Sequence, residues 1–250
     1  MKRTRRQWLL ISLTFIICHL SFSAARAQSE LWITGSAVPG GIQKLTVAPG
    51  HSFKYAGELV AGELRIQTTK KVGKDTHYYA PALPDANIAN RGTAFTETAD
   101  ATAAAWQVSF GSANYRFTVD ARGKSLRGEV FKPWGELFIA GGATEVGWKC
   151  EGKMLLMTQD LENPCVWTWE GKLRNRPQFE EPRSFKFQGQ DRWGPKALHP
   201  YTQGADILTD GQLRTGGDDT KWTISREGRY RITVDVFHET VKAELIASEK

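Results

Sequence analysis

The chain has 250 residues and a formal net charge of +6, which at first points to nucleic acid or an anionic membrane. Residues 1–27 carry five of the 33 Lys and Arg and no acid, so the remainder holds 28 bases against 27 acids. With 40% hydrophobic and 24% charged residues the chain is not disordered. No apolar run beyond residue 27 reaches the roughly 20 residues of a membrane-spanning helix. We therefore expect no nucleic-acid partner and no transmembrane segment in the mature chain.

The N-terminus has the order of a secretory signal peptide. A basic stretch, Lys2–Arg6, precedes an apolar stretch, Trp8–Phe22, and small residues then end in an Ala-x-Ala cleavage pattern before Gln28. Two alternatives stay open, an uncleaved membrane anchor and lipidation at Cys18, although Ile17 before that cysteine is bulky where such sites have a small residue. All three interpretations predict export from the cytoplasm.

Beyond the leader, the chain repeats itself at the scale of a domain. Four segments recur in the same order: Glu30–Gly35 and Glu136–Gly141, Phe53–Leu59 and Trp167–Leu173, Trp106–Ser109 and Trp222–Ser225, Tyr115–Asp120 and Tyr230–Asp235. Their offsets lie between 106 and 116 residues, which fits domains of about 100 residues and not short solenoid repeats. We predict two related domains, residues 28–131 and 134–250.

Both copies have the pattern of short β-strands. In Tyr230–Val236 apolar and polar residues alternate, which places the apolar side chains on one face. Gly, Asn and Asp turns separate such segments, and only Asp85–Asn90 and Asp100–Ala105 favour helix. About 100 residues of short alternating strands predict an antiparallel β-sandwich for each copy, and hence an all-β chain. The aromatic residues expected in the cores are Trp106, Phe117, Phe185, Phe187 and Trp222.

Two cysteines, Cys150 and Cys165, remain after the leader. The sequence between them predicts a hairpin with strands over Lys153–Thr158 and Cys165–Glu170. Export permits a disulfide, but this hairpin separates Cys150 from the residue opposite Cys165 by about 25 Å of extended strand. A bridge therefore needs the intervening loop to fold back, and a disulfide and two free thiols both stay open. No zinc-finger spacing of His and Cys occurs, and we expect neither a metal nor a cofactor.

Four motifs of the second copy follow one another in a recognisable order. They are Leu137–Trp148, Trp167–Leu173, Ser184–Phe187 and Gly228–Asp235, and the first copy has the same order with fewer matches. This order resembles the starch-binding modules of the SusE/SusF outer-membrane proteins, which are non-catalytic surface lipoproteins of Bacteroidetes. The resemblance implies immunoglobulin-like β-sandwich domains and a polysaccharide ligand. It also implies an outer-membrane, cell-surface or periplasmic location in a Gram-negative bacterium, with an outer-membrane transporter or other glycan-binding proteins as partners.

A sugar ring has an apolar C–H face and a rim of hydroxyls, so its site needs an exposed aromatic plane with polar side chains beside it. By the resemblance, the second copy supplies such a site from Trp148, Lys186, Trp193 with Arg192 beside it, and Asp218 or Asp219. Each Trp has a role in the core as its alternative, because large aromatics are usually mostly buried. Lys186 could equally be an ordinary solvated lysine.

The first copy departs from this pattern. Ile42 stands at the position of the first Trp, Arg65 takes the position of the lysine, and Tyr78 and Tyr79 are the aromatic candidates. Without the first aromatic plane the sequence predicts a weak or lost site. This copy could instead act as a spacer or bind a different glycan through its tyrosines.

The sequence carries no catalytic motif. A glycosidase needs two carboxylates held across a cleft, whereas Glu180–Glu181 and Asp218–Asp219 are merely adjacent pairs. The nucleophile-elbow, Walker A and His-Glu-x-x-His motifs are absent. We therefore predict a non-enzymatic protein that binds starch, another α-glucan or a related glycan in support of uptake. The alternative is a structural or adhesive module that binds protein partners of a glycan-uptake complex without binding sugar.

Overall fold

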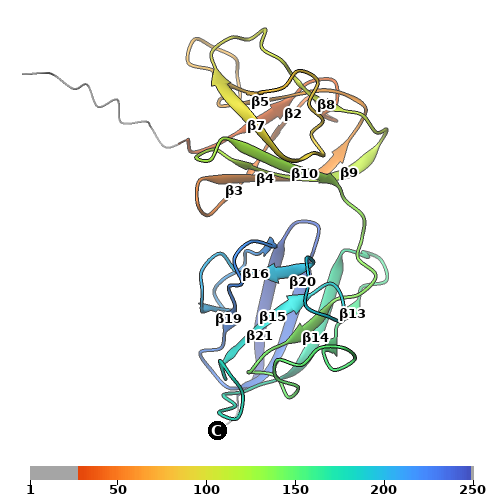
Figure 1. The fold of residues 1–250 in the computed structure, drawn as a ribbon, viewed down its shortest axis with the longest axis vertical. Coiled ribbons are helices and arrows are strands. Elements are labelled where there is room, and N and C mark those ends of the chain that lie inside the picture. Colours follow the sequence, from red (N-terminus) through yellow and green to blue (C-terminus); the bar gives the residue numbers. More distant parts are fainter. Residues whose placement is uncertain (1–27, 249–250) are drawn as a thin grey trace, which may run out of the picture.

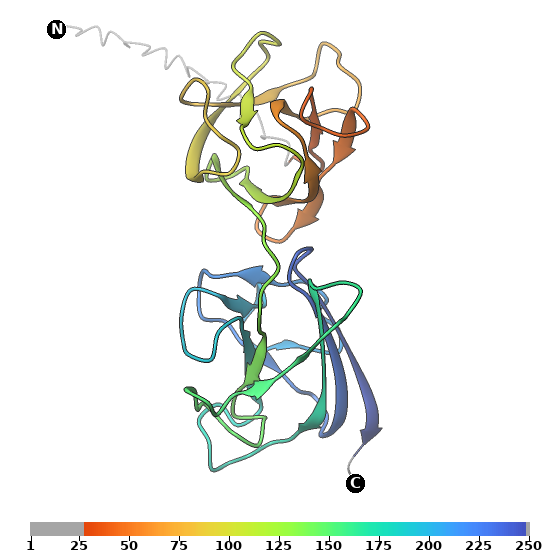
Figure 2. The same ribbon diagram turned by 90° about the vertical axis from the view of Figure 1, so that its right-hand side faces the viewer.

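The computed structural model describes residues 28–248, and this part of the chain is all-β, as predicted. It contains short strands and no helix, and none of its elements is a helix long and apolar enough to cross a membrane. The predicted signal peptide, with Cys18, lies outside the described residues. The strands form two lobes joined by one connecting segment (Figures 1 and 2).

The N-terminal lobe holds a single ten-stranded sheet. Its strands are β1 (Trp32–Thr34), β2 (Ile42–Lys44), β3 (Thr46–Ala48), β4 (Ser52–Leu59), β5 (Gly62–Gln67), β6 (Tyr78–Pro81), β7 (Arg91–Thr98), β8 (Trp106–Val108), β9 (Ala113–Asp120) and β10 (Ser125–Val130). They run in the order β2-β1-β5-β6-β7-β10-β9-β4-β3, with β8 against β5. Because β7 pairs with both β6 and β10, the two layers of this lobe are joined edge to edge.

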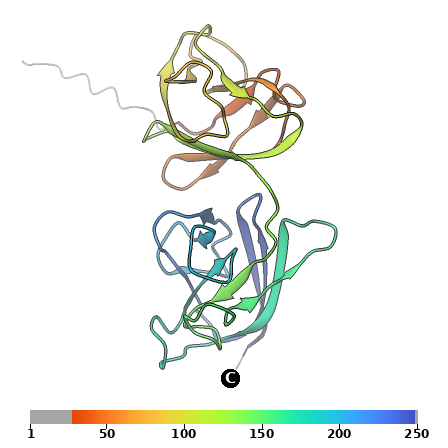
Figure 3. The same ribbon diagram turned by 45° about the vertical axis from the view of Figure 1, so that its right-hand side comes forward.

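The C-terminal lobe is a sandwich of two separate sheets (Figure 3). Its strands are β11 (Phe138–Ala140), β12 (Leu155–Leu156), β13 (Thr158–Gln159), β14 (Val166–Leu173), β15 (Ser184–Gln188), β16 (Ala197–His199), β17 (Ala205–Asp206), β18 (Arg214–Thr215), β19 (Trp222–Thr223), β20 (Gly228–Asp235) and β21 (Thr240–Ser248). The seven-stranded sheet contains β12-β11-β15-β16-β18, with β19 against β15 and β17 against β19. The four-stranded sheet is β13-β14-β20-β21.

Strand pairing repeats along with the sequence. The pairs β1–β5, β4–β9, β5–β8 and β9–β10 recur as β11–β15, β14–β20, β15–β19 and β20–β21. The register recurs too, because Arg65 lies opposite Thr34 and Lys186 lies opposite Ala140 at equivalent places. This repetition supports a duplicated unit, while the boundaries at 28–131 and 134–250 stay a prediction.

Each lobe has its own hydrophobic core, and the predicted aromatic residues lie in it. Trp106 and Phe117 belong to the N-terminal core, and Phe185, Phe187 and Trp222 to the C-terminal one, all of them at most 1% exposed. The Phe187 and Trp222 rings pack at 5.1 Å between centroids. Aromatic burial on one face of each alternating strand therefore holds the layers together.

The structure corrects the two segments expected to be helical and the bounds of the predicted hairpin. The segments Asp85–Asn90 and Asp100–Ala105 form turns and no helix. At Asp100 the side chain accepts the backbone N–H of Thr102 at 2.7 Å, an Asx turn that competes with helix. In the hairpin, the second strand spans Val166–Leu173 and not the predicted Cys165–Glu170, and Thr158 lies opposite Thr168.

The two cysteines are free thiols, and the possible disulfide is not formed. Cys165 lies in the main core of the C-terminal lobe, whereas Cys150 packs against a small separate cluster of Phe138, Ala140 and Met154. The loop therefore does not fold back to bring the two sulfur atoms together.

The lobes contact one another beside their connecting segment. Arg116 Nη1 donates to the carbonyl oxygen of Val236 at 2.6 Å, and the rings of Phe131 and Phe237 lie 4.9 Å apart. Glu239, in the turn between β20 and β21, is buried and lies 2.6 Å from Lys54 and 3.5 Å from Arg116. A buried ionic cluster thus spans the two lobes.

Candidate functional site

Two tryptophans lie side by side on the surface of the C-terminal lobe. Trp148 comes from the loop after β11 and Trp193 from the loop between β15 and β16, and their ring centroids are 6.2 Å apart with planes inclined by 48°. Trp193 is 38% exposed and Trp148 is half-buried. The sequence predicted both as ligand contacts, and the structure brings them together although 45 residues separate them in the chain.

The loop before Trp148 is shaped by a glycine. Gly147 has a φ of +63°, a left-handed conformation that glycine adopts without steric cost. A Cβ there would also lie only 2.8 Å from the ring of Phe179. The indole Nε1 of Trp148 donates to the carbonyl oxygen of Glu180 at 2.7 Å. The ring is therefore held against the 179–181 segment by its polar edge.

Lys186 lies beneath this pair. It sits on β15 between the core residues Phe185 and Phe187, so the strand alternation turns it away from the core. Lys186 is nevertheless buried, with only 8% of the residue exposed. Its Nζ lies 4.6 Å from the centre of the Trp193 ring and 2.6 Å from Asp219 Oδ1, and these groups cover it. Lys186 is therefore no ordinary solvated lysine, and it is fixed beside the aromatic pair.

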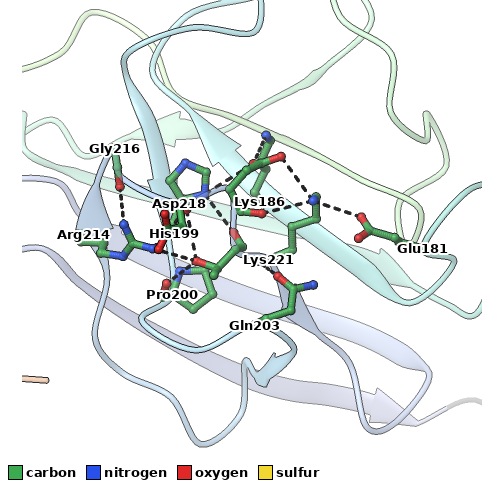
Figure 4. A network of polar contacts seen from close by, with 11 residues as sticks. Glu181, Lys186, His199, Pro200, Gln203, Arg214, Gly216, Asp218 and Lys221 are labelled. Atoms are coloured by element: carbon green, nitrogen blue, oxygen red, sulfur yellow. Dashed lines mark hydrogen bonds and ion pairs between the residues drawn. The ribbon is translucent and has the colours of Figure 1, made fainter. Parts of the chain in front are cut away.

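Asp219 is shared by two lysines. Besides Lys186, the Nζ of Lys221 lies 3.3 Å from its carboxylate. The same Nζ lies 3.3 Å from Glu181 (Figure 4) and 5.5 Å from the centre of the Trp148 ring. Burial alone would raise the pKa of Asp219, but the two ammonium groups outweigh it and hold that pKa below its ordinary value. The carboxylate is therefore ionised at neutral pH.

The loop that carries these charges is anchored from below. His199 Nδ1 donates to the carbonyl oxygen of Thr220 at 2.8 Å, and the backbone N–H of Lys221 donates to Gln203 at 3.0 Å (Figure 4). Burial lowers the pKa of His199 in spite of the Thr220 contact, and the neighbouring charge of Lys186 lowers it further. A neutral imidazole thus supports the loop by hydrogen bonding.

The assembled residues line an open pocket of about 600 Å³. Its walls are Trp148, Glu180, Glu181, Lys186, Trp193, Asp219 and Lys221. Four of the predicted site residues are therefore brought together. Glu180, Glu181 and Lys221 were not predicted as ligand contacts. For Lys221 a signal existed, because it directly precedes the buried Trp222 and so points to the other side of the strand.

Two predicted residues do not line the pocket. The backbone carbonyl of Asp218 accepts a hydrogen bond from Arg214 at 3.1 Å, but its carboxylate joins none of the contacts of the pocket. Arg192 is exposed beside Trp193 and is likewise no part of the lining. Of the pair left open by the sequence, Asp219 and not Asp218 is the pocket carboxylate.

The equivalent region of the N-terminal lobe is closed. Arg65 matches Lys186 in register, but its Nη1 donates to the carbonyl oxygens of Ala101 and Ala103 at 3.0 and 2.8 Å. Tyr78 and Tyr79 are 6% and 3% exposed, so neither ring offers an open aromatic plane. Arg65 is held by hydrogen bonds within the lobe at this position.

The pocket offers ring faces, ammonium donors and carboxylate acceptors, which is a set that recognises hydroxylated rings. Within residues 28–248 no group of His, Cys, Asp and Glu is arranged to hold a metal ion. The chemistry available at the pocket is therefore stacking, hydrogen bonding and charge.

Comparison with known proteins places few constraints on the family. No protein-family model matches the chain, and no curated protein matches it. Among solved structures it is similar to SusF from Bacteroides thetaiotaomicron, with 12% identity, a TM-score of 0.38 and 88% of this chain covered. The chain spans about half of that protein's length, 48%. At this identity and TM-score the similarity assigns neither a family nor a ligand.

Proposed function

We propose that the protein binds a polysaccharide, without catalysis, on the surface formed by Trp148 and Trp193. The observation that carries this proposal is the contact of the two indoles from separate loops, with Lys186 and Asp219 directly beside them. With the predicted signal peptide, such a protein would act at the cell envelope in support of glycan uptake.

The inclination of the two indoles supports a curved ligand. Sugar rings stack their C–H faces on aromatic planes, and planes inclined by 48° suit a chain that turns between successive rings. An α-glucan such as starch turns in this way, whereas a flat β-linked ribbon does not. Lys186, Lys221 and Asp219 would then bond the hydroxyls at the rim of the rings.

The charges in the pocket support binding over hydrolysis. A glycosidase needs one carboxylic acid whose pKa is raised so that it can protonate the leaving oxygen. Asp219 has the opposite shift, because Lys186 and Lys221 hold it ionised. The ionised Asp219 carboxylate can accept a hydrogen bond from a hydroxyl but is not suited to act as that acid.

Affinity electrophoresis of the protein in native gels containing starch, pullulan or a β-glucan tests the proposal. We expect starch and pullulan to retard the wild type and Trp148→Ala to bind about tenfold more weakly, since stacking on one ring contributes roughly 1–3 kcal/mol in nucleic-acid complexes. Phe110→Ala is the matched control, because Phe110 is 59% exposed on the other lobe.

Three results bear directly on this assignment. Equal retardation of wild type and Trp148→Ala would remove the aromatic pair from the site. Retardation by the β-glucan alone would keep glycan binding and remove the α-glucan. No retardation by any glycan would favour a module that binds protein partners.

A further inference from the structure

A second cavity lies between the two lobes, away from the tryptophan pair. Its volume is about 290 Å³, near the lower end of small-ligand pockets. The residues that matter here are Arg91, Arg116, Arg127, Trp134, Lys196 and Glu239. The first three come from the N-terminal lobe, Trp134 from the connecting segment, and the last two from the C-terminal lobe.

The cavity has more positive than negative charge. The charge of Arg116 is balanced within the cavity, because Glu129 lies 3.0 Å from its Nε and Glu239 lies 3.5 Å from its Nη1. Arg91, Arg127 and Lys196 have no acidic partner among residues 28–248. These three cations therefore make no ion pair, although Glu129 and Glu239 line the same space, and the wall keeps an excess of positive charge.

Two of these cations are placed against each other by the sheet. Arg91 on β7 and Arg127 on β10 are directly opposite in the strand register, next to a bulge in the ladder. Like charges in such a cross-strand pair are destabilising. An anion bound between the two guanidinium groups would convert this repulsion into charge-assisted hydrogen bonds.

The rest of the wall is mixed, with Thr118, Thr215, Glu129 and Glu239 beside Trp134 and Pro195. Trp134 packs against Gly189, where a side chain would collide with the indole, and Lys196 Nζ lies 5.7 Å from the centre of its ring. The threonine hydroxyls and the carboxylates can bond hydroxyl groups. A ligand that fits the whole wall therefore combines one negative group with a compact hydroxylated ring.

We propose that this cavity binds an acidic sugar, a uronate whose carboxylate lies between Arg91 and Arg127 and whose hydroxyls bond the polar side chains of the wall. A single sugar unit suits the size of the cavity. The site shares no residue with the Trp148 surface and stands independently of the function proposed for it.

Titration of the protein with sodium glucuronate, followed by calorimetry and by tryptophan fluorescence, tests this site. We expect binding of glucuronate and not of its methyl ester, which has the same ring but no charge. Arg91→Gln/Arg127→Gln should weaken binding at least about tenfold, since hydrogen bonds to charged groups are among the strongest in proteins. Lys196→Gln, on the other lobe, should weaken it independently.

Arg122→Gln is the matched control, because Arg122 is exposed outside the cavity, and Trp148→Ala should also bind glucuronate normally. Thermal unfolding of each variant shows whether it is folded. Equal binding of the methyl ester, or unchanged binding in both cavity variants, overturns the proposal. Inorganic sulfate binding as tightly as glucuronate overturns the sugar and leaves an anion site only.

Discussion

Asp219 provides the counter-ion for Lys186, the buried lysine beside the aromatic pair. Lys186 is largely removed from water, and its ammonium has one carboxylate partner at 2.6 Å together with the face of Trp193. A buried charge without its counter-ion is costly. The pocket therefore depends on the neighbouring loop for its charge balance.

Asp219→Asn is expected to lower the free energy of unfolding by about 1–3 kcal/mol, because the amide leaves the Lys186 ammonium partly unsatisfied. Glycan affinity should fall at the same time. Asp218→Asn is the matched control, since the adjacent carboxylate lies outside the pocket. Chemical denaturation of both variants measures the difference, and equal stabilities would contradict the role given to Asp219.

Alternation along a strand was enough to predict where Lys186 points. Its setting between Phe185 and Phe187 required nothing beyond the period of two. The same alternation beside Trp222 gives the direction of Lys221. Its contact with Glu181 could not be predicted in this way, because it depends on how loops from distant parts of the chain meet. The same limit applies to Tyr78 and Tyr79, whose burial the sequence did not reveal.

At the scale of the strands, one repeated glycine controls how closely two of them meet. Gly141 follows β11 with a φ of +154°, and a Cβ there would collide with the Cα of Phe185 and the carbonyl oxygen of Ser184 on β15. Gly35 has the same role after β1, where the carbonyl oxygen of Glu63 lies in the way. The repeated motif therefore preserves a close backbone approach.

Gly141→Ala should destabilise the protein by about 1–3 kcal/mol, because the extra methyl group overpacks a rigid backbone contact. Gly211→Ala is a suitable comparison, since a Cβ there would lie 3.5 Å from the carbonyl oxygen of Val241. Thermal unfolding of both should separate them clearly. If the two variants unfolded alike, the close approach at Gly141 would not be a constraint.

Long strands were easier to predict than short ones. The alternation in β9 and β20 identified them directly, and their duplication located the partner strands. β12, β13, β17, β18 and β19 have only two residues each, too few to show any period. In β7 only Phe95 is buried, so its role in joining the two layers of the N-terminal lobe gave no hydrophobic signal.

On the scale of the whole molecule, Glu239 connects the lobes. Burial alone would raise its pKa, but Arg116 and Lys54 outweigh burial and hold that pKa below its ordinary value of 4.5. Burial lowers the pKa of Lys54 in spite of Glu239, since Arg116 and Arg214 also repel its charge. Glu239 is thus a buried carboxylate that balances Lys54 and Arg116 at the joint.

Glu239→Gln should lower the free energy of unfolding by about 3 kcal/mol, because it leaves buried cations unpaired. Since those cations lie between the lobes, small-angle scattering should show a larger radius of gyration. Glu129→Gln is the matched control, since Glu129 also contacts Arg116 but its side chain is 42% exposed, where an ion pair contributes less than about 1 kcal/mol. An unchanged scattering profile in Glu239→Gln would contradict the role of Glu239 in holding the two lobes together.

The lowered pKa of Glu239 also fixes the direction of a pH effect. A carboxylate with a depressed folded-state pKa stabilises fully above its ordinary value and loses that contribution as the pH falls through the folded value. The difference in stability between wild type and Glu239→Gln should therefore be constant near neutrality and shrink below about pH 4.5. Denaturation measured across this pH range checks the sign.

The two lobes differ at one seam. In the N-terminal lobe β7 closes the gap between the layers. In the C-terminal lobe no strand does so among the described residues, and the seam has the isolated bridge between Gln212 and Thr240 and the hydrogen bonds of Thr215 to Glu239. Backbone amides along an unclosed seam exchange their hydrogens through small local openings. In the lobe that carries the open pocket, we therefore expect deuterium uptake to begin along β18.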